Sequence, residues 1–255
     1  MAENHPTPQD RPVNIWTRCR TVLDAAATIG ILVVCVVILW DRGQRADTPQ
    51  PPRTPVAPAV APLPEEPIEV GEAASRGDPA APVGLLIFSD FQCPFCQRFA
   101  TDTLPSIDSE YVTRGKVRLL QMHLPLDRIH PQAFRAAEAA ECARRQGQFW
   151  PYHDGLFAAP SQLDDDSLLR RAEDVRLDRE AFQTCLRSGS ATKVRSEQQL
   201  GARLGITGTP AFIIGRFGPD GRLRATGRIS GARPLAEFQA AFDAALPKGA
   251  GPSTN

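Results

Sequence analysis

Residues 83–96 read VGLLIFSDFQCPFC, and this stretch decides the fold. Its first half, Val83–Ser89, is a continuous apolar run, which is typical of a strand buried on both faces of a sheet. Two cysteines, Cys93 and Cys96, follow this run, and a helical pattern comes after them. Residues 117–123 (VRLLQMH) predict a second strand. The sequence therefore predicts an α/β unit with a cysteine pair at the end of its first strand.

The spacing of these cysteines favours redox chemistry. Two intervening residues place both sulfurs in the first turn of the helix, where free N–H groups and the helix dipole stabilise a thiolate. Pro94 is compatible with this turn, because its missing N–H has no partner to lose. We expect Cys93 to be exposed and nucleophilic, and Cys96 to be shielded and to resolve the mixed disulfide. The alternatives are an inert bridge and a zinc site, but His123 and His130 form no recognisable second ligand pair.

A second motif lies about 110 residues downstream of the first. Residues 205–210 read GITGTP and precede the apolar run 211–214. A proline directly before a buried strand forms a turn or a cis peptide bond. Together the two motifs resemble the DsbA-like branch of the thioredoxin superfamily, and the resemblance covers roughly residues 82–246.

This resemblance implies a thioredoxin-like α/β fold with a helical subdomain inserted at about residues 130–204. It also implies that the Thr209–Pro210 bond is cis, that it faces Cys93 and Cys96, and that the Thr209 backbone pairs with a substrate peptide as an added strand. Neither a cofactor nor a metal is implied, since the cysteines themselves carry the electrons.

The insertion has helical material and a second cysteine pair. Helix-like patterns cover residues 131–146, 148–157, 165–174, 178–187 and 191–204. His153 recurs at helical spacing with two aromatic residues, so we interpret it as a residue at the edge of the core and not as a catalytic one. Cys142 and Cys185 lie in two of these helices, and some relatives have a structural disulfide here. Two buried free thiols are the alternative, but an oxidising compartment favours the bridge.

Two positions depart from the family pattern. Ile87 stands where thioredoxin and typical DsbA proteins have an acidic residue on the first strand. Asp90 is the nearest carboxylate, so it is either a substitute proton acceptor or a cap that accepts backbone N–H bonds at the helix start. Phe95 replaces the histidine of the strongest oxidases, which predicts a less extreme oxidant because no cation stabilises the Cys93 thiolate.

An apolar segment lies near the N-terminus. Residues 25–40 carry no charge, and residues 22–40 are long enough to span a membrane. No pair of small residues with signal-peptidase spacing follows, which favours a retained anchor over a cleaved signal or a buried helix. Residues 1–21 are then a cytoplasmic tail, although three arginines on each side make the charge rule nearly neutral. Cys19 and Cys35 receive no function.

The segment after this span is rich in proline. Residues 43–82 hold ten of the 24 prolines, which excludes helix and sheet interiors. We predict a semi-rigid linker over residues 41–81, with a docking site for a proline-recognition domain as the alternative. Residues 247–255 predict a disordered tail.

The sequence as a whole favours one function. With 29 basic and 29 acidic residues there is no basic surplus for nucleic acid. We expect a single-pass, membrane-anchored protein-disulfide oxidoreductase whose catalytic domain lies on the periplasmic side of the cell membrane and oxidises the thiols of exported proteins. The resemblance implies that a quinone-linked membrane enzyme or a thiol partner reoxidises it. The alternatives are a reductase or isomerase of exported apoproteins, and a non-catalytic binding or metal-handling module.

Overall fold

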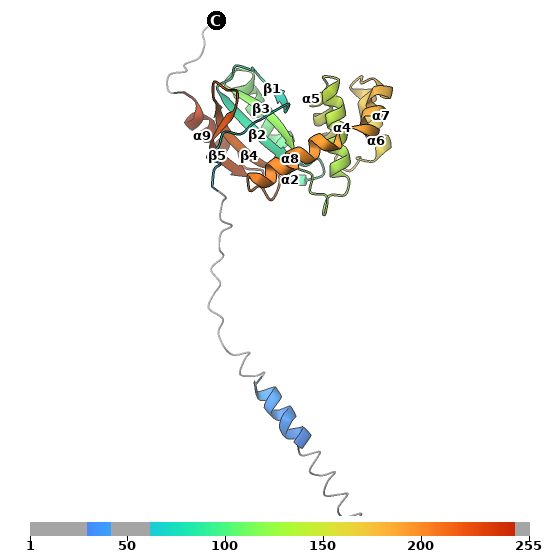
Figure 1. Cartoon of the computed structure of the whole chain (residues 1–255), viewed down its shortest axis with the longest axis vertical. Coiled ribbons are helices and arrows are strands. Elements are labelled where there is room, and N and C mark those ends of the chain that lie inside the picture. The colour runs from blue at the N-terminus through green and yellow to red at the C-terminus, as the bar shows by residue number, and fades with distance from the viewer. Residues whose placement is uncertain (1–29, 42–61, 248–255) are drawn as a thin grey trace, which may run out of the picture. The chain divides into compact units, whose positions relative to one another are not determined.

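The computed structural model describes residues 30–41 and 62–247, which belong to two separate units of the chain, residues 1–59 and 60–255 (Figure 1). In the first unit, residues 30–41 form a helix. No helix among the described residues is both long enough and apolar enough to cross a membrane. The predicted tail at 1–21, part of the predicted span at 22–40 and residues 248–255 lie outside the described residues.

The second unit is built on one mixed sheet of five strands in the order β1-β3-β2-β4-β5. β2 and β3 run parallel, and the other neighbours are antiparallel. The strands are β1 (Ala74–Arg76), β2 (Val83–Ser89), β3 (Val117–His123), β4 (Ala211–Phe217) and β5 (Leu223–Ser230). All seven residues of β2 are buried, as its continuous apolar run predicts for a central strand. This mixed α/β arrangement confirms the thioredoxin-like part of the predicted fold class, whereas the predicted transmembrane helix is not found among the described residues.

Helices connect the strands in two places. Between β2 and β3 a continuous helical stretch comprises α2 (Pro94–Arg98), η1 (Phe99–Thr103), α3 (Leu104–Ile107) and η2 (Asp108–Val112). Between β3 and β4 the inserted helices are α4 (Ala133–Arg145), α5 (Phe149–Ala158), α6 (Asp165–Asp174), α7 (Arg179–Ser188) and α8 (Ala191–Arg203). The last helix of the described residues is α9 (Leu235–Ala245). Figure 1 shows α5, α6 and α7 gathered beside the sheet, with α8 leading back to it.

Alternate residues of β2 supply two separate cores. Leu85 and Ile87 pack with α9 and the helical stretch that follows α2, whereas Leu86 and Phe88 pack on the opposite face with residues near the start of the unit and from α8. Ile87 is therefore part of a closely packed apolar core, which explains why a carboxylate can be absent there without leaving a gap. A third core lies within the insertion and reaches Cys93 and Cys96.

Residues 42–61 of the predicted linker at 41–81 lie outside the described residues, but its predicted end at residue 81 is too late. Ile68 is buried and exchanges two backbone hydrogen bonds with Leu223, of 2.8 and 2.9 Å. Ala74–Arg76 then forms the edge strand β1 against β3. These pairings begin directly after Pro67, where the proline density falls. A strand of three residues carries too little periodicity for a sequence pattern to find it.

The structure joins Cys142 of α4 to Cys185 of α7 by a disulfide. The bond encloses α5 and α6, and it attaches the outer helix of the insertion to the helix that follows β3. Because the two cysteines are 43 residues apart, opening this loop increases the entropy of the unfolded chain considerably.

We predict that replacing both Cys142 and Cys185 by alanine lowers the free energy of unfolding by about 4 kcal/mol, the loop-closure value for a ring of this size. Urea unfolding followed by circular dichroism measures this difference. Both proteins should carry Cys93→Ala and Cys96→Ala, so that the pair under test makes the only difference between them. A change below about 1 kcal/mol would contradict a structural role for this bond.

Candidate active site

The cysteine pair sits where β2 passes into α2. Cys93 has an extended backbone and is the N-cap of α2, and Pro94 occupies the first turn. Cys96 lies one turn further and is 1% exposed, as predicted. The predicted exposure of Cys93 is wrong, since its side chain is only 4% exposed. Phe95 between them is 52% exposed, so the outer surface of this turn is apolar.

The Thr209–Pro210 segment, whose peptide bond is cis, accounts for part of the burial of Cys93. Cys93 Sγ lies 3.5 Å from the backbone oxygen of Thr209, to which it donates while it is protonated. The two motifs are 116 residues apart and meet because β2 and β4 are antiparallel, with Phe88 opposite Ala211. The start of β4 therefore lies beside the end of β2.

The same geometry shifts the two thiols in opposite directions. The hydrogen bond from the Cys96 side chain is the largest influence on Cys93. Together with the Thr209 side chain and the backbone N–H groups of Cys96 and Phe95, it outweighs burial and lowers the pKa of Cys93 to about 5. Burial, reinforced by the neighbouring Cys93, raises the pKa of Cys96 well above its usual range. Near neutral pH the pair therefore holds one thiolate, on Cys93, and one thiol, on Cys96.

Asp90 joins the cysteine loop to the segment after β3. Its side chain is buried, and one oxygen accepts the Gln92 N–H at 2.7 Å. The other oxygen accepts the Leu126 N–H at 2.8 Å and lies 2.8 Å from His130 Nδ1. Its own backbone N–H donates to Cys96 Sγ at 3.5 Å. Asp90 does accept backbone N–H bonds, as the cap interpretation predicts. The N-cap of α2 is Cys93, however, so Asp90 is not the cap of this helix. Its carboxylate links the loop before α2 to the segment after β3.

Two residues that hold the loop of Asp90 in place were not predicted from the sequence. His130 was considered only as a possible zinc ligand. Among the described residues it pairs with Asp90 and not with the cysteines. Gln92 accepts the backbone N–H of Gln132 through its side-chain oxygen, at 2.9 Å. The loop of residues 90–92 is therefore held by the segment 126–132, which lies about 40 residues away and carries no local pattern that predicts the contact.

His153 lies in the core of the insertion. Its ring contacts those of Phe157 and Trp150, with centroids 4.9 and 5.0 Å apart, and also that of Phe91, at 5.6 Å. Burial lowers its pKa, against the opposing effect of Asp154. These contacts agree with a packing role for His153.

A thioredoxin family model matches residues 69–221, which is more than half of the chain. The chain belongs to the thioredoxin family. A thioredoxin-like oxidoreductase from Silicibacter pomeroyi DSS-3 is 27% identical and has a TM-score of 0.55, covering 68% of this chain and 91% of its own. A variant of α-DsbA1 from Wolbachia pipientis is 25% identical with a TM-score of 0.61, covering 69% and 92%. This thioredoxin-family chain is thus similar to DsbA-like thiol–disulfide oxidoreductases.

Curated relatives of this thioredoxin-family chain fall into two groups. "Probable disulfide bond formation protein D" of Bacillus anthracis is 28% identical over 150 residues, which are 55% of this chain and 68% of that protein. "Na(+)/H(+) antiporter NhaA 3" of Salinispora tropica is 36% identical over 150 residues, which are 58% of this chain but 22% of the antiporter. The chain spans less than a third of the length of the antiporter relatives, so ion transport is not carried over to it.

We predict that alkylation of Cys93 by iodoacetamide has its midpoint near pH 5, where an ordinary thiol gives about 8.5. Tandem mass spectrometry follows the reaction, because it places the label on Cys93 or Cys96 within the one peptide that contains both. The Cys96→Ala variant should move the midpoint upward, because it removes the strongest stabilising hydrogen bond. A midpoint of 8 or higher in the unmutated chain would exclude the thiolate.

The Asp90→Ala variant tests the role of this carboxylate. We expect it to lower the free energy of unfolding by about 2–4 kcal/mol, since two backbone N–H groups lose their acceptor. If Asp90 only joins the two loops, its replacement should leave the solvent deuterium isotope effect on the attack of Cys96 on the mixed disulfide unchanged. If stability is kept and only that isotope effect changes, Asp90 is a proton acceptor instead.

Proposed function

We propose that this chain oxidises pairs of thiols in exported proteins to disulfides. The observation that carries the proposal is the asymmetry of the pair: a stabilised thiolate at Cys93, a buried thiol at Cys96, and the Thr209 backbone beside them. In the oxidised enzyme, a substrate thiolate attacks Cys93 Sγ and breaks the Cys93–Cys96 bond, and Cys96 takes up a proton. A second substrate thiolate attacks the substrate sulfur of the mixed disulfide and expels Cys93 as a thiolate. The substrate loses two electrons and the enzyme gains them.

The low pKa of Cys93 supports the oxidising direction. At pH 7 a pKa of about 5 favours the reduced enzyme by roughly 100-fold over one with an ordinary thiol, which makes the disulfide about 60 mV more oxidising. This effect comes from hydrogen bonds alone, because Phe95 supplies no charge. It supports an oxidase of moderate strength.

Substrate binding is proposed to use the backbone next to the cis bond. An extended peptide that pairs with Thr209 would bring its cysteine to Cys93, because the Thr209 oxygen already lies 3.5 Å from Cys93 Sγ. Phe95, exposed at the rim, offers an apolar contact for the same peptide. The reaction needs no cofactor beyond the cysteines.

The location and the redox partner are further parts of the proposal. In the helix of residues 30–41, residues 31–40 are all apolar, which supports a segment that is covered by lipid. An anchor at residues 22–40 and a proline-rich tether would keep the catalytic domain near a quinone-linked membrane enzyme, or near a thiol partner, that withdraws the two electrons.

Two measurements test this function. Equilibration of the purified chain with glutathione should give a potential above about −250 mV; a lower value would indicate a reductase. In cells, the Cys96→Ala variant should accumulate mixed disulfides with exported proteins through Cys93. Cys93→Ala is the matched control and should trap none, and equal trapping by both variants would remove Cys93 as the nucleophile.

A further inference from the structure

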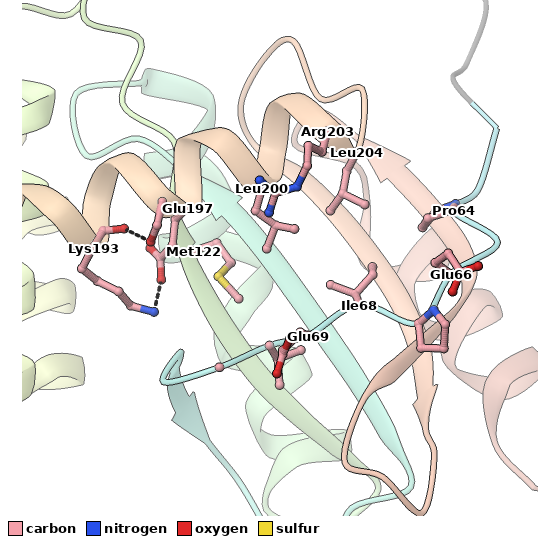
Figure 2. Close-up of a pocket in the computed structure, with 14 residues that line it drawn as sticks. Pro64, Glu66, Ile68, Glu69, Met122, Lys193, Glu197, Leu200, Arg203 and Leu204 are labelled. Atoms are coloured by element: carbon pink, nitrogen blue, oxygen red, sulfur yellow. Dashed lines mark hydrogen bonds and ion pairs between the residues drawn. The ribbon is translucent and has the colours of Figure 1, made fainter.

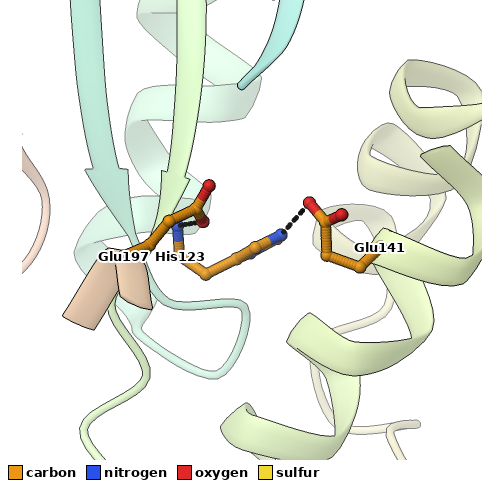
Figure 3. Close-up of side chains that lie close together, drawn as sticks. All are labelled: His123, Glu141 and Glu197. Atoms are coloured by element: carbon orange, nitrogen blue, oxygen red, sulfur yellow. Dashed lines mark hydrogen bonds and ion pairs between the residues drawn. The ribbon is translucent and has the colours of Figure 1, made fainter. Parts of the chain in front are cut away.

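Three buried side chains away from the cysteines converge at the junction of the sheet and the insertion. His123 ends β3, Glu141 comes from α4 and Glu197 from α8, and they are 1%, 2% and 3% exposed. One ligand atom of each lies within 4.8 Å of the others. Figure 3 shows the imidazole between the two carboxylates. We propose that this cluster, His123–Glu141–Glu197, binds a divalent transition-metal cation.

The hydrogen bonds of the cluster leave one nitrogen unused. Glu197 accepts the backbone N–H of His123 at 2.7 Å, and the His123 ring meets Glu141 through Nε2 at 3.3 Å. His123 Nδ1 is buried and has no hydrogen-bond partner among the described residues. The ring nitrogen that faces Glu141 is Nε2, whereas Nδ1 lies on the other edge of the ring, so the candidate ligand atom is Nε2 and a metal ion would take the place of the proton between Nε2 and Glu141.

The donor set indicates the class of cation. One imidazole and two carboxylates suit zinc or manganese, whereas magnesium and calcium favour oxygen ligands alone. Bonds of about 2.0–2.2 Å place two ligand atoms at most about 4.4 Å apart. The present spacing therefore needs only a small inward movement of the side chains.

Two basic residues now neutralise the carboxylates. Lys193 lies 2.9 Å from Glu197, and Arg144 lies 2.7 Å from Glu141. Both basic side chains are partly exposed, at 23% and 24%, so each can turn toward solvent when a cation enters. A dication then balances the two carboxylates, and Lys193 becomes a competitor of the metal.

A pocket open to solvent borders the cluster at Glu197. Its volume is about 520 Å³, and Glu197, Lys193 and Met122 line one end of it (Figure 2). Glu66 and Glu69 line the part formed by the chain before β1. With Glu197, the three carboxylates of the lining outnumber its two basic residues, Lys193 and Arg203, so the charge of the pocket favours cations. A bound ion would join β3, α4 and α8, and so fasten the insertion to the sheet.

The test uses the full-length chain in detergent, oxidised so that Cys93 and Cys96 cannot bind metal, with the remaining thiols alkylated. After EDTA treatment and dialysis, Zn²⁺ is added, and bound metal is measured by mass spectrometry together with the melting temperature. We expect one equivalent of zinc, and a rise in Tm of about 5 °C or more at 100-fold excess over Kd. Absence of binding at 1 mM Zn²⁺ would overturn the proposal.

Variants locate the ion. Glu197→Gln should weaken zinc binding at least tenfold, and the matched control Glu69→Gln, at the rim of the pocket, should change it less than twofold. Equal binding by the Glu197→Gln and unmutated chains would place the ion elsewhere and overturn the assignment.

Lys193→Met separates a metal site from a network of ion pairs and remains informative if Glu197→Gln does not fold. If the cluster binds metal, loss of the competing ammonium group tightens zinc binding about tenfold, and zinc restores the Tm that the variant loses. If the cluster is only an ion-pair network, the variant loses stability and zinc restores none of it, which would overturn the proposal.

Discussion

The pairing of β2 with both of its neighbours is the constraint on which the site depends. β3 lies parallel to it on one side and β4 antiparallel on the other, so three chain segments meet at the carboxyl end of β2. One continues into the cysteines, one leaves β3 toward His130, and one enters β4 through Thr209 and Pro210. Register alone brings these segments together, because Ser89 lies opposite His123 and Phe88 opposite Ala211.

Within that frame, the chemistry arises from unequal solvation of two identical groups. Cys93 is surrounded by donors at the start of a helix, whereas Cys96 lies one turn deeper among apolar residues. Burial penalises a charge on either sulfur, but only Cys93 has enough hydrogen bonds to overcome it. A single thiolate is thereby assigned to the sulfur that is near the substrate-binding backbone, with no charged neighbour required.

Local patterns in the sequence predict much of this architecture. The bounds of β2 and β3 agree with the predicted strands because each is a short apolar run, and the five inserted helices follow from their periodicity. The resemblance to a family also placed Thr209–Pro210 beside the cysteines and favoured the Cys142–Cys185 bridge, but the other contacts between distant residues could not be predicted. The bonds of Asp90 to Leu126 and His130 span 36 and 40 residues, and His123 meets Glu197 across 74. Cys93 was expected to be exposed because its position at the start of the helix implies access; the resemblance placed Thr209–Pro210 opposite it, but how far the residue is buried depends on packing that no local pattern encodes.

The Cys142–Cys185 bond has a consequence for the continuity of the chain. Residues 159–164, between α5 and α6, lie inside the covalent ring, and Ser161 and Gln162 are exposed there. A protease that cuts this connection produces two fragments that stay linked through the sulfur atoms. The first fragment holds β1 to β3 with Cys93, and the second holds β4 and β5 with Thr209. Because the sheet needs both, the nicked protein keeps its strands in one covalent molecule for as long as its surroundings remain oxidising.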